Sequence, residues 1–418
     1  MLVPILSLIA TSPNMAHPSF SSVNGSLYVD EKPLQLKGVN WYGFETQQGV
    51  FHGLFAQPPS IFLNLLQTNG FNAVRIPLDV DLMLHDRKHG FIKPEAWEAN
   101  STNCSHLDSA PADSGNNLDS ASAESSVEYC PSHLMRNTSL ETLDWFVDAL
   151  GAHGVLVLFD MHCLSTAGTD ASPVFFDASH PVDSVLKAWS TLARRFAGRW
   201  NVLGADVFNE PFGATWAMSA PTDMDAFATR AAAAIHAEAA DWLIFVEGAA
   251  HSPNCSSTID GDQVECGYGD NLLGVQQHPV VLPVAGKLVY SVHTYGPSQH
   301  DRPEFHNANF PTNMPDVWEQ HWGYVTSLPN APAVVLGEWG GPTDGANGQW
   351  MEALVAYLQG KQLQSNFFWA LNEDGSPRGI ITDWTTTPIS LDQDKLTLLA
   401  QLTPQPTAFT PPSPFRDF

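Results

Sequence analysis

The sequence predicts a single (β/α)8 barrel. Eight short apolar runs alternate along the chain with amphipathic helical patterns, which is the order of elements in that fold. The runs are almost continuous in Val, Leu and Phe, as expected of parallel strands that are covered on both faces. A doubly wound sheet is the alternative, but its first strand would lead into a glycine-rich phosphate-binding turn. The first run here leads into GVNWYGFE, which is not such a turn.

The eight predicted strands are separated by segments long enough for helices. They comprise residues 34–44, 71–78, 155–162, 202–211, 243–248, 288–296, 333–341 and 366–375.

Four intervening segments have helical patterns, at residues 138–150, 182–199, 222–240 and 347–362. The first of them opens with Thr138 and Glu141, three residues apart, which is the spacing of a capping box. In the second, apolar residues such as Val185, Trp189 and Leu192 fall on one helical stripe. These patterns predict helices that pack against the outside of the barrel.

Two segments fall outside the strand and helix alternation. Residues 19–34 place Asn24-Gly25 between two β-like runs, which predicts a hairpin that caps the barrel floor. Residues 98–136 are rich in Ser, Asn and Asp and poor in apolar side chains, so we expect a long loop inserted after the second strand. The expected domain organisation is one catalytic domain over 19–405, after a leader (1–18) and before a tail (406–418).

The charge balance narrows the class of partner. The chain has 18 Lys and Arg against 44 Asp and Glu, a formal net charge of −26. Such a chain repels nucleic-acid phosphates and anionic membrane surfaces. We therefore expect a neutral substrate and no nucleic-acid or membrane partner. We also expect no cofactor or metal, and a monomer.

Several signals favour secretion. Five Asn-x-Ser/Thr sequons occur, at Asn24, Asn100, Asn103, Asn137 and Asn254, and predict a glycoprotein. The first 16 residues are apolar and short like a signal peptide, although they lack a basic start.

The five cysteines are compatible with an oxidising compartment. Cys104 and Cys130 bracket one loop, Cys255 and Cys266 bracket another, and each pair is a possible disulfide. Cys163 is left over.

Polar side chains gather at the ends of the predicted strands, where barrels of this type carry their active sites. Six of the eight strands end in such residues: Arg75; Asp160 and His162; Asn209 and Glu210; His293 and Tyr295; Glu338; and Trp369 with Asn372. Packing alone does not explain this convergence.

Glu210 and Glu338 end the fourth and seventh strands, which lie on opposite sides of a barrel mouth. Their carboxylates can therefore face each other across a ligand. Two carboxylates about 5–5.5 Å apart are typical of a retaining glycosidase, with one as proton donor and the other as nucleophile. Trp41, Tyr42, Trp339 and Trp369, close to the strand ends, have flat faces suited to sugar rings.

Motifs after four strands resemble glycoside hydrolase family 5, the cellulase family: NEP (209–211), HTY (293–295), GEWG (337–340) and FFWALNEDG (367–375). Longer stretches, including LKGVNWYGFET, LVYSVHTY and TNMPDVWEQHWGY, are similar to secreted bacterial-type endo-β-1,4-glucanases. The resemblance extends over residues 34–384 and implies a cellulase of the same fold.

The resemblance also implies a role for each matched residue. Glu210 would be the general acid and then the general base, and Glu338 would be the nucleophile. Arg75 would keep Glu338 ionised, with Tyr295 donating to it or lying close by. The other implied roles are sugar 2-hydroxyl binding by Asn209, a hydrogen-bonded floor formed by His162 and His293, and stacking by Trp369. We also expect Trp41, Tyr42 and Asn372 to contact substrate.

Three alternatives remain open. The same mechanism could act on β-mannan, xyloglucan or β-1,3-glucan, because loop contacts rather than the catalytic groups select the sugar. A metal-dependent barrel hydrolase could use His162 and His293, although strand one lacks the His-x-His that such sites usually carry. A carbohydrate-binding barrel without catalytic activity is the third, although neither carboxylate is missing.

Overall fold

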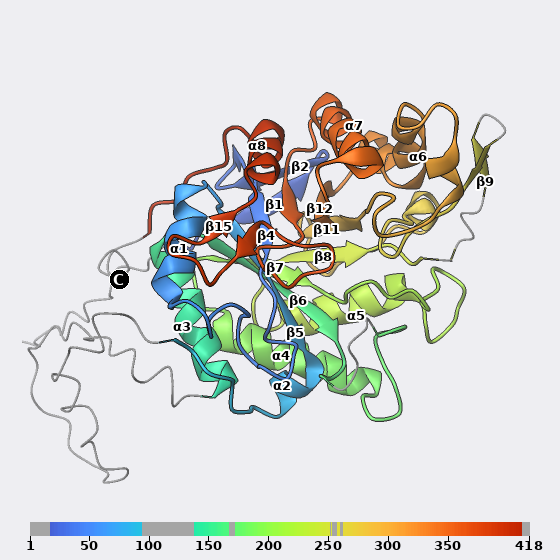
Figure 1. The fold of residues 1–418 in the computed structure, drawn as a ribbon. Helices are drawn as coiled ribbons and strands as arrows, with labels where there is room; N and C mark the ends of the chain where they lie inside the picture. Colours follow the sequence, from blue (N-terminus) through green and yellow to red (C-terminus); the bar gives the residue numbers. More distant parts are fainter. Residues whose placement is uncertain are drawn as a thin grey trace, which may run out of the picture.

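The structure, a computed structural model, describes residues 17–93, 138–166, 172–250, 252, 257–259 and 262–411. Eight parallel strands close into a barrel in the order β4-β5-β6-β7-β8-β11-β12-β13. Figure 1 shows these strands in the middle of the molecule, with α3, α4 and α5 below them and α6, α7 and α8 above. The predicted (β/α)8 barrel is confirmed.

Each barrel strand coincides with one of the eight predicted runs, although the second and third strands extend one residue past their runs, to Asp79 and Cys163. The strands are β4 (Lys37–Asn40), β5 (Ala73–Asp79), β6 (Leu156–Cys163), β7 (Val202–Asp206), β8 (Leu243–Glu247), β11 (Leu288–His293), β12 (Ala333–Trp339) and β13 (Asn366–Phe368). Almost every residue in them is buried, because side chains point alternately into the barrel and toward the helices.

The helices pack around the barrel. They are α1 (Pro59–Thr68), α2 (Val80–Leu84), α3 (Ser139–Ala152), α4 (Val182–Phe196), α5 (Met224–His236), α6 (Met314–His321), α7 (Gly345–Lys361) and α8 (Gln393–Leu402). Helix α3 begins with the predicted capping box, in which the Thr138 hydroxyl accepts from the backbone N–H of Glu141 and the Glu141 carboxylate accepts from the N–H of Thr138. Helix α4 buries Val185, Trp189 and Leu192, as its pattern predicts.

Shorter elements lie in the loops. The connection from β8 to β11 contains a small antiparallel pair, β9 (Ser257–Ile259) and β10 (Asp262–Val264), and the 3-10 helix η4 (Leu273–Gln276). Two further 3-10 helices, η5 (Pro303–His306) and η6 (Gly323–Ser327), flank α6, and β14 (Ile381–Asp383) pairs with β15 (Ser390–Leu391).

An antiparallel sheet closes the barrel floor. It consists of β1 (Phe20–Val23), β2 (Ser26–Val29) and a short third strand, β3 (Lys32–Pro33). The turn between β1 and β2 has positive φ at both Asn24 (49°) and Gly25 (74°), which is the conformation that an Asn-Gly hairpin favours. Apolar residues of the sheet form one cluster with first residues of barrel strands, such as Leu156 and Leu243. The predicted floor cap is confirmed, with one strand more than expected.

Several sequence predictions fall on residues outside the described ones. These are the leader over its first 16 residues, the whole 98–136 insertion, Cys104, Cys130, Cys255 and four of the five sequons. Cys266 is disulfide-bonded, and Cys163 is a buried free thiol on β6. No helix in the described part of the chain is long and apolar enough to span a membrane.

Candidate active site

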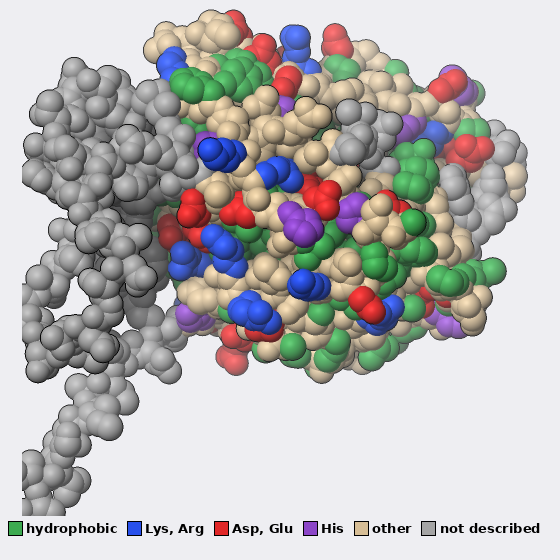
Figure 2. All heavy atoms as spheres, turned by 90° about the horizontal axis from the view of Figure 1, so that it is seen from below, with side chains coloured by type: hydrophobic (Ala, Val, Ile, Leu, Met, Phe, Trp, Pro, Cys, Tyr) green, Lys and Arg blue, Asp and Glu red, His purple; other side chains and the backbone are tan. Residues whose placement is uncertain are grey.

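The carboxyl ends of the barrel strands bring charged side chains to a common site. Asn40, Arg75, Asp160, Asp206, Glu247, His293 and Glu338 all lie in or at the ends of barrel strands and are buried. Figure 2, which shows the molecule from below, has histidine and acidic side chains side by side near the middle of that face.

Arg75 is at the centre of this network and is wholly buried. Its Nη1 lies 2.7 Å from Glu338 Oε1, its Nη2 lies 3.0 Å from Asp160 Oδ1, and its Nε lies 3.2 Å from Asp206 Oδ2. Burial lowers the pKa of Arg75, but the surrounding carboxylates raise it further, so the guanidinium stays charged. Its rigid fork of donors therefore holds three carboxylates in place.

Glu338, on β12, is 4% exposed. Arg75 donates to its Oε1, and the Tyr295 hydroxyl donates to Oε2 over 2.8 Å. Burial raises the pKa of Glu338, while the positive charge of Arg75 acts in the opposite direction. Both oxygens are thus held by donors, and the orientation of the carboxylate is defined.

Glu210 follows β7 and faces Glu338. Its φ is 41°, a left-handed conformation that turns the chain sharply after the strand, and its N–H donates to Glu247 Oε2 over 2.8 Å. Glu210 Oε1 lies 3.1 Å from His293 Nδ1, and Glu210, His293 and Glu338 each place a ligating atom within 4.8 Å of the others. Burial and then the Glu338 charge raise the pKa of Glu210 to about 8. The two carboxylates are therefore close enough to act on one bound group.

Trp369 lies nearly parallel to two other rings, at centroid distances of 5.5 Å from Tyr42 and 5.7 Å from His162 and with interplanar angles of 11° in both cases. His162 Nδ1 lies 2.7 Å from Asp160 Oδ2. Burial lowers the pKa of His162, but Asp160 and the other nearby carboxylates outweigh it and raise the pKa to about 9.

Two predicted substrate contacts are corrected by the structure. Trp41 is wholly buried and stacks on Phe51 at 3.9 Å, so its ring is not available to a sugar. Side chains alternate along a strand, and since Asn40 points into the barrel, Trp41 points toward the helices. For the same reason Trp339, next to Glu338, is buried.

Asn372 is also buried, and its side chain bonds the backbone of Tyr42 through both Oδ1 and Nδ2, each over 3.2 Å. Its observed contacts fix the position of Tyr42 and are not directed at the surface.

The sequence reasoning missed Asp206, Glu247 and Asn40. Asp206 Oδ2 accepts from the Ser291 hydroxyl over 3.0 Å as well as from Arg75. Asn40 Oδ1 accepts from Arg75 Nη1 over 3.0 Å. The available signal was a charged or amide residue within an otherwise apolar strand, since a buried carboxylate needs a partner.

A second pair of rings was also missed. Phe212 stacks on Tyr268 with a centroid distance of 5.1 Å, and Tyr268 is 39% exposed. The backbone N–H of Phe212 donates to the carbonyl oxygen of Glu210 over 2.7 Å. Phe212 lies two residues after Glu210, and Tyr268 comes from the connection between β8 and β11. The sequence pattern did not distinguish either residue.

Three groups of side chains in the described ranges have metal-ligating atoms close together: Glu210, His293 and Glu338; Asp206, Glu247 and His293; and Cys266, Asp270 and His321. In the first two groups Arg75 already bonds Glu338 and Asp206, so a guanidinium supplies the positive charge there. In the third, Cys266 is disulfide-bonded and offers no thiolate.

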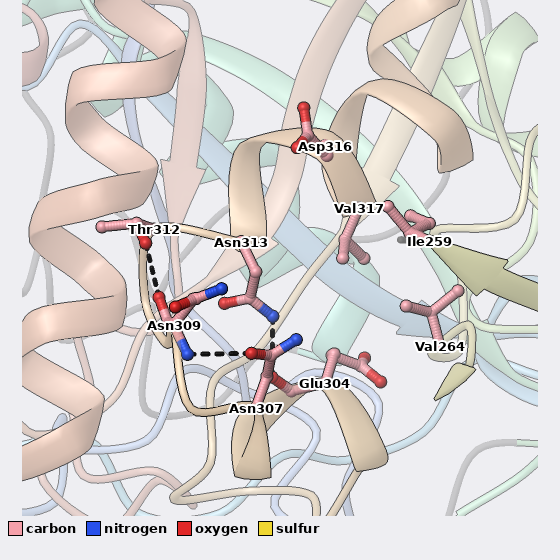
Figure 3. Close-up of a pocket in the computed structure, with 9 residues that line it drawn as sticks. All are labelled: Ile259, Val264, Glu304, Asn307, Asn309, Thr312, Asn313, Asp316 and Val317. Carbon is pink, nitrogen blue, oxygen red and sulfur yellow. Dashed lines mark hydrogen bonds between the residues drawn. The ribbon is translucent and has the colours of Figure 1, made fainter. Parts of the chain in front are cut away.

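A separate pocket of about 130 Å³ lies between β10, η5 and α6 (Figure 3). Its lining includes Glu304, Asn307 and Asn313, with Ile259 and Val264 from the β9–β10 pair. None of the nine lining residues contacts Arg75, and the pocket is not part of the site described above.

Comparison with known proteins gives a consistent result. The family model Cellulase (glycosyl hydrolase family 5) matches residues 32–375. An endoglucanase from Paenibacillus polymyxa is 31% identical over 372 residues, which are 87% of this chain and 82% of that protein. The major extracellular endoglucanase of Xanthomonas campestris pv. campestris is 35% identical, over 93% of this chain and 72% of that protein.

Solved structures agree. The catalytic domain of the major endoglucanase from Xanthomonas campestris pv. campestris has a TM-score of 0.76 and 32% identity, with 92% of this chain and 100% of that chain covered. An endocellulase from Pyrococcus horikoshii, in a complex with cellotetraose, has a TM-score of 0.76 and 29% identity, with 93% and 99% covered. The chain described here is therefore a glycosyl hydrolase and belongs to the cellulase family, glycosyl hydrolase family 5.

Proposed function

We propose that this glycosyl hydrolase is an endo-β-1,4-glucanase in which Glu338 is the nucleophile and Glu210 is the acid and base. The retaining double-displacement mechanism is general to the family. The observation that supports this assignment most strongly is the approach of the Glu210 and Glu338 carboxylates to within 4.8 Å. That separation suits direct attack by one carboxylate and is shorter than the roughly 6.5–9.5 Å typical of an inverting pair.

In the first step, Glu338 attacks the anomeric carbon while Glu210 donates its proton to the glycosidic oxygen. The C–O bond breaks, the leaving chain departs with a new hydroxyl, and the sugar is esterified to Glu338. In the second step, Glu210, now a carboxylate, takes a proton from water. The resulting hydroxide attacks the anomeric carbon, and Glu338 is released as a carboxylate.

The electrostatics of the site support both steps. Arg75 and Tyr295 donate to Glu338 and stabilise the ionised nucleophile. The Glu338 charge helps to keep Glu210 protonated before attack. Once Glu338 is esterified that charge is lost, so Glu210 ionises more readily and can act as the base.

The stacked rings and Asn209 are proposed to hold the substrate. Trp369, with Tyr42 beside it, offers a flat face for a pyranose ring. Asn209 Oδ1 accepts from Arg75 over 3.0 Å, which orients the side chain so that its amide nitrogen can donate to the sugar 2-hydroxyl. Phe212, two residues after the proton donor, and Tyr268, which stacks on it, are proposed to contact the leaving part of the substrate chain.

We further propose a secreted monomer with one catalytic domain over residues 19–405, in which 98–136 is a loop insertion. The five sequons and the disulfide-bonded Cys266 support secretion. So does the similarity to a relative described as a major extracellular endoglucanase.

A substrate panel tests the proposed activity. Release of reducing ends from carboxymethylcellulose, β-mannan, xyloglucan and laminarin is compared at equal mass of polymer. We expect the highest rate on carboxymethylcellulose, together with a rapid fall in its viscosity, because an endo-acting enzyme cuts within the chain. The endoglucanase relatives and the cellotetraose complex of the Pyrococcus protein favour this result. Higher activity on mannan would contradict the proposal.

The pH dependence follows from the two carboxyl groups. Glu210 must carry a proton in the first step, so we expect kcat/KM for cellotetraose to fall as the pH rises through about 8. Glu338 must be ionised, and because its pKa is raised, the acid limb is expected above the ordinary glutamate pKa of about 4.3.

The control for this profile is 2,4-dinitrophenyl β-cellobioside, whose leaving group needs no proton. We expect the alkaline limb of kcat/KM to disappear for this substrate, since Glu210 is not required as an acid. If the limb stays at the same pH, another group, such as His162 with its pKa of about 9, sets it instead.

A further inference from the structure

Glu247 lies directly behind the proposed proton donor. It is the last residue of β8 and is wholly buried. Its Oε2 accepts from the backbone N–H of Glu210 over 2.8 Å, and its Oε1 lies 3.2 Å from His293 Nε2 and 3.4 Å from Arg75 Nη2. One carboxyl group therefore contacts both the backbone of Glu210 and the histidine that faces the Glu210 side chain.

His293 forms a bridge between the two glutamates. Its Nε2 faces Glu247 Oε1, and its Nδ1 lies 3.1 Å from Glu210 Oε1. Burial, together with the charges of Arg75 and His162, lowers the pKa of His293 well below its usual value, so the ring is neutral and carries one proton. The nitrogen that carries this proton decides whether His293 Nδ1 is a hydrogen-bond donor or an acceptor toward Glu210 Oε1.

Only one of the two tautomers serves the proposed reaction. With the proton on Nε2, the bare Nδ1 would accept the acid proton of Glu210 and withdraw it from the substrate. With the proton on Nδ1, His293 donates to Glu210 Oε1, and the proton of Glu210 is left on the other oxygen. In the second tautomer Nε2 is an acceptor. It is buried and makes no hydrogen bond in the structure, and Glu247 Oε1 lies 3.2 Å from it.

Glu247 can supply a donor to Nε2 in its protonated form, which its burial among other carboxyl groups favours. Arg75 faces four carboxyl groups, those of Asp160, Asp206, Glu247 and Glu338, and His162 is a second cation beside Asp160. Burial and the neighbouring Asp206 raise the pKa of Glu247 well above its usual value. A protonated Glu247 can donate from Oε1 to His293 Nε2 while Oε2 accepts from the N–H of Glu210.

We propose that Glu247 is a positioning residue that donates to His293 Nε2, holds His293 in the tautomer that donates to Glu210 Oε1, and anchors the backbone of Glu210. This inference rests on the proposed role of Glu210 as the acid and base. The orienting chain runs from Glu247 through His293 to Glu210, and it keeps the proton of Glu210 available for the glycosidic oxygen. In the second step the same Nδ1–H stabilises the Glu210 carboxylate that activates water.

Two substitutions separate the hydrogen bonds from the charge. In Glu247→Gln, the amide nitrogen can donate to His293 Nε2 and the amide oxygen can accept from the N–H of Glu210. We expect this variant to keep kcat/KM for cellotetraose within about threefold of the wild type. Glu247→Met has a similar volume but neither contact, and we expect a loss of roughly 10²-fold, since a positioned general acid contributes 10²–10⁴-fold.

Substrates with different leaving groups distinguish a loss of acid positioning from a general disturbance of the active site. For 2,4-dinitrophenyl β-cellobioside, which needs no acid, we expect Glu247→Met to lose less than about fivefold in kcat/KM. Glu304→Met is the matched control, since Glu304 is a glutamate 1% exposed that lines the pocket in Figure 3, away from the site. It should affect the two substrates equally, and thermal unfolding of each variant reports on folding.

The outcomes distinguish this inference from the proposed function. A Glu247→Gln variant as impaired as Glu247→Met would overturn the inference, because the charge rather than the donor would matter. Equal losses on both substrates in Glu247→Met would also overturn it, in favour of a structural role. If Glu247→Met does not fold, the kcat/KM of Glu247→Gln alone tests the inference. If wild type cleaves neither substrate, or Glu210→Ala shows no dependence on the leaving group, the proposed function itself is wrong.

Discussion

Replacement of Glu338 by glutamine is expected to lower kcat on β-1,4-glucan by roughly 10⁴-fold or more, the range seen when a covalent nucleophile is removed. The amide has nearly the same shape and can still accept from Arg75, but it cannot form the glycosyl ester. The measurement is the rate of release of reducing ends from carboxymethylcellulose, with binding of cellotetraose followed by calorimetry. Binding should persist while turnover is lost.

The matched control is Glu319→Gln. Glu319 is a partly exposed glutamate on the outer helix α6, where it pairs with Lys361. We expect its kcat to remain within about twofold of the wild type, since substitutions of surface residues usually have small effects. A Glu338→Gln variant that keeps more than about a hundredth of wild-type kcat would show that Glu338 is not the nucleophile.

Replacement of Glu210 by alanine is expected to have the second-largest effect, with a different dependence on the substrate. Without the acid, kcat/KM for cellotetraose should fall by about 10²–10⁴-fold, the contribution of general acid catalysis. For 2,4-dinitrophenyl β-cellobioside the first step needs no proton, so it should remain fast while the second step slows. Stopped-flow recording should then show a burst of dinitrophenolate followed by slow turnover.

An equal loss on both substrates, without a burst, would contradict the assignment of Glu210 as the acid and base. The burst also provides an internal control, because its amplitude counts folded and active molecules. The two substitutions are therefore distinguishable: Glu338→Gln abolishes the burst and Glu210→Ala reveals it.

Much of the fold could be predicted because local signals agree with the final structure. Each barrel strand coincides with an apolar run to within one residue at its end or lies inside it, the Thr138 and Glu141 spacing becomes a capping box, and Asn24-Gly25 forms the floor hairpin. In these cases the physical cause lies within a few neighbouring residues. Short-range patterns therefore suffice to place the element.

The convergence of Arg75, Glu210 and Glu338 followed from topology, since parallel strands bring their carboxyl ends to one face. The error over Trp41 has a different origin. A position close to a strand end does not by itself give a side chain access to the barrel mouth. Side chains alternate along the strand, so Trp41 points outward while the neighbouring Asn40 points into the barrel. Applying the alternation to each strand would have corrected this prediction.

Glu247 could not be assigned from the sequence for a further reason. Its role depends on the orientation of His293 and on a backbone N–H of Glu210, which come from different strands and loops. A sequence shows that a carboxylate lies within an apolar run, but it does not show which partner offsets the free-energy cost of burying that carboxylate. Only the three-dimensional arrangement identifies a donor to one nitrogen of a histidine.

The stereochemistry of the product tests the account most directly. Proton NMR of a cellotetraose digest, recorded within minutes of adding enzyme and before mutarotation, shows which anomer forms first. A pair of carboxylates within 4.8 Å predicts that the β anomer appears first and later equilibrates with the α form. Initial formation of the α anomer would mean a single displacement by water, and the assignment of Glu338 as a nucleophile that forms a glycosyl-enzyme would be wrong.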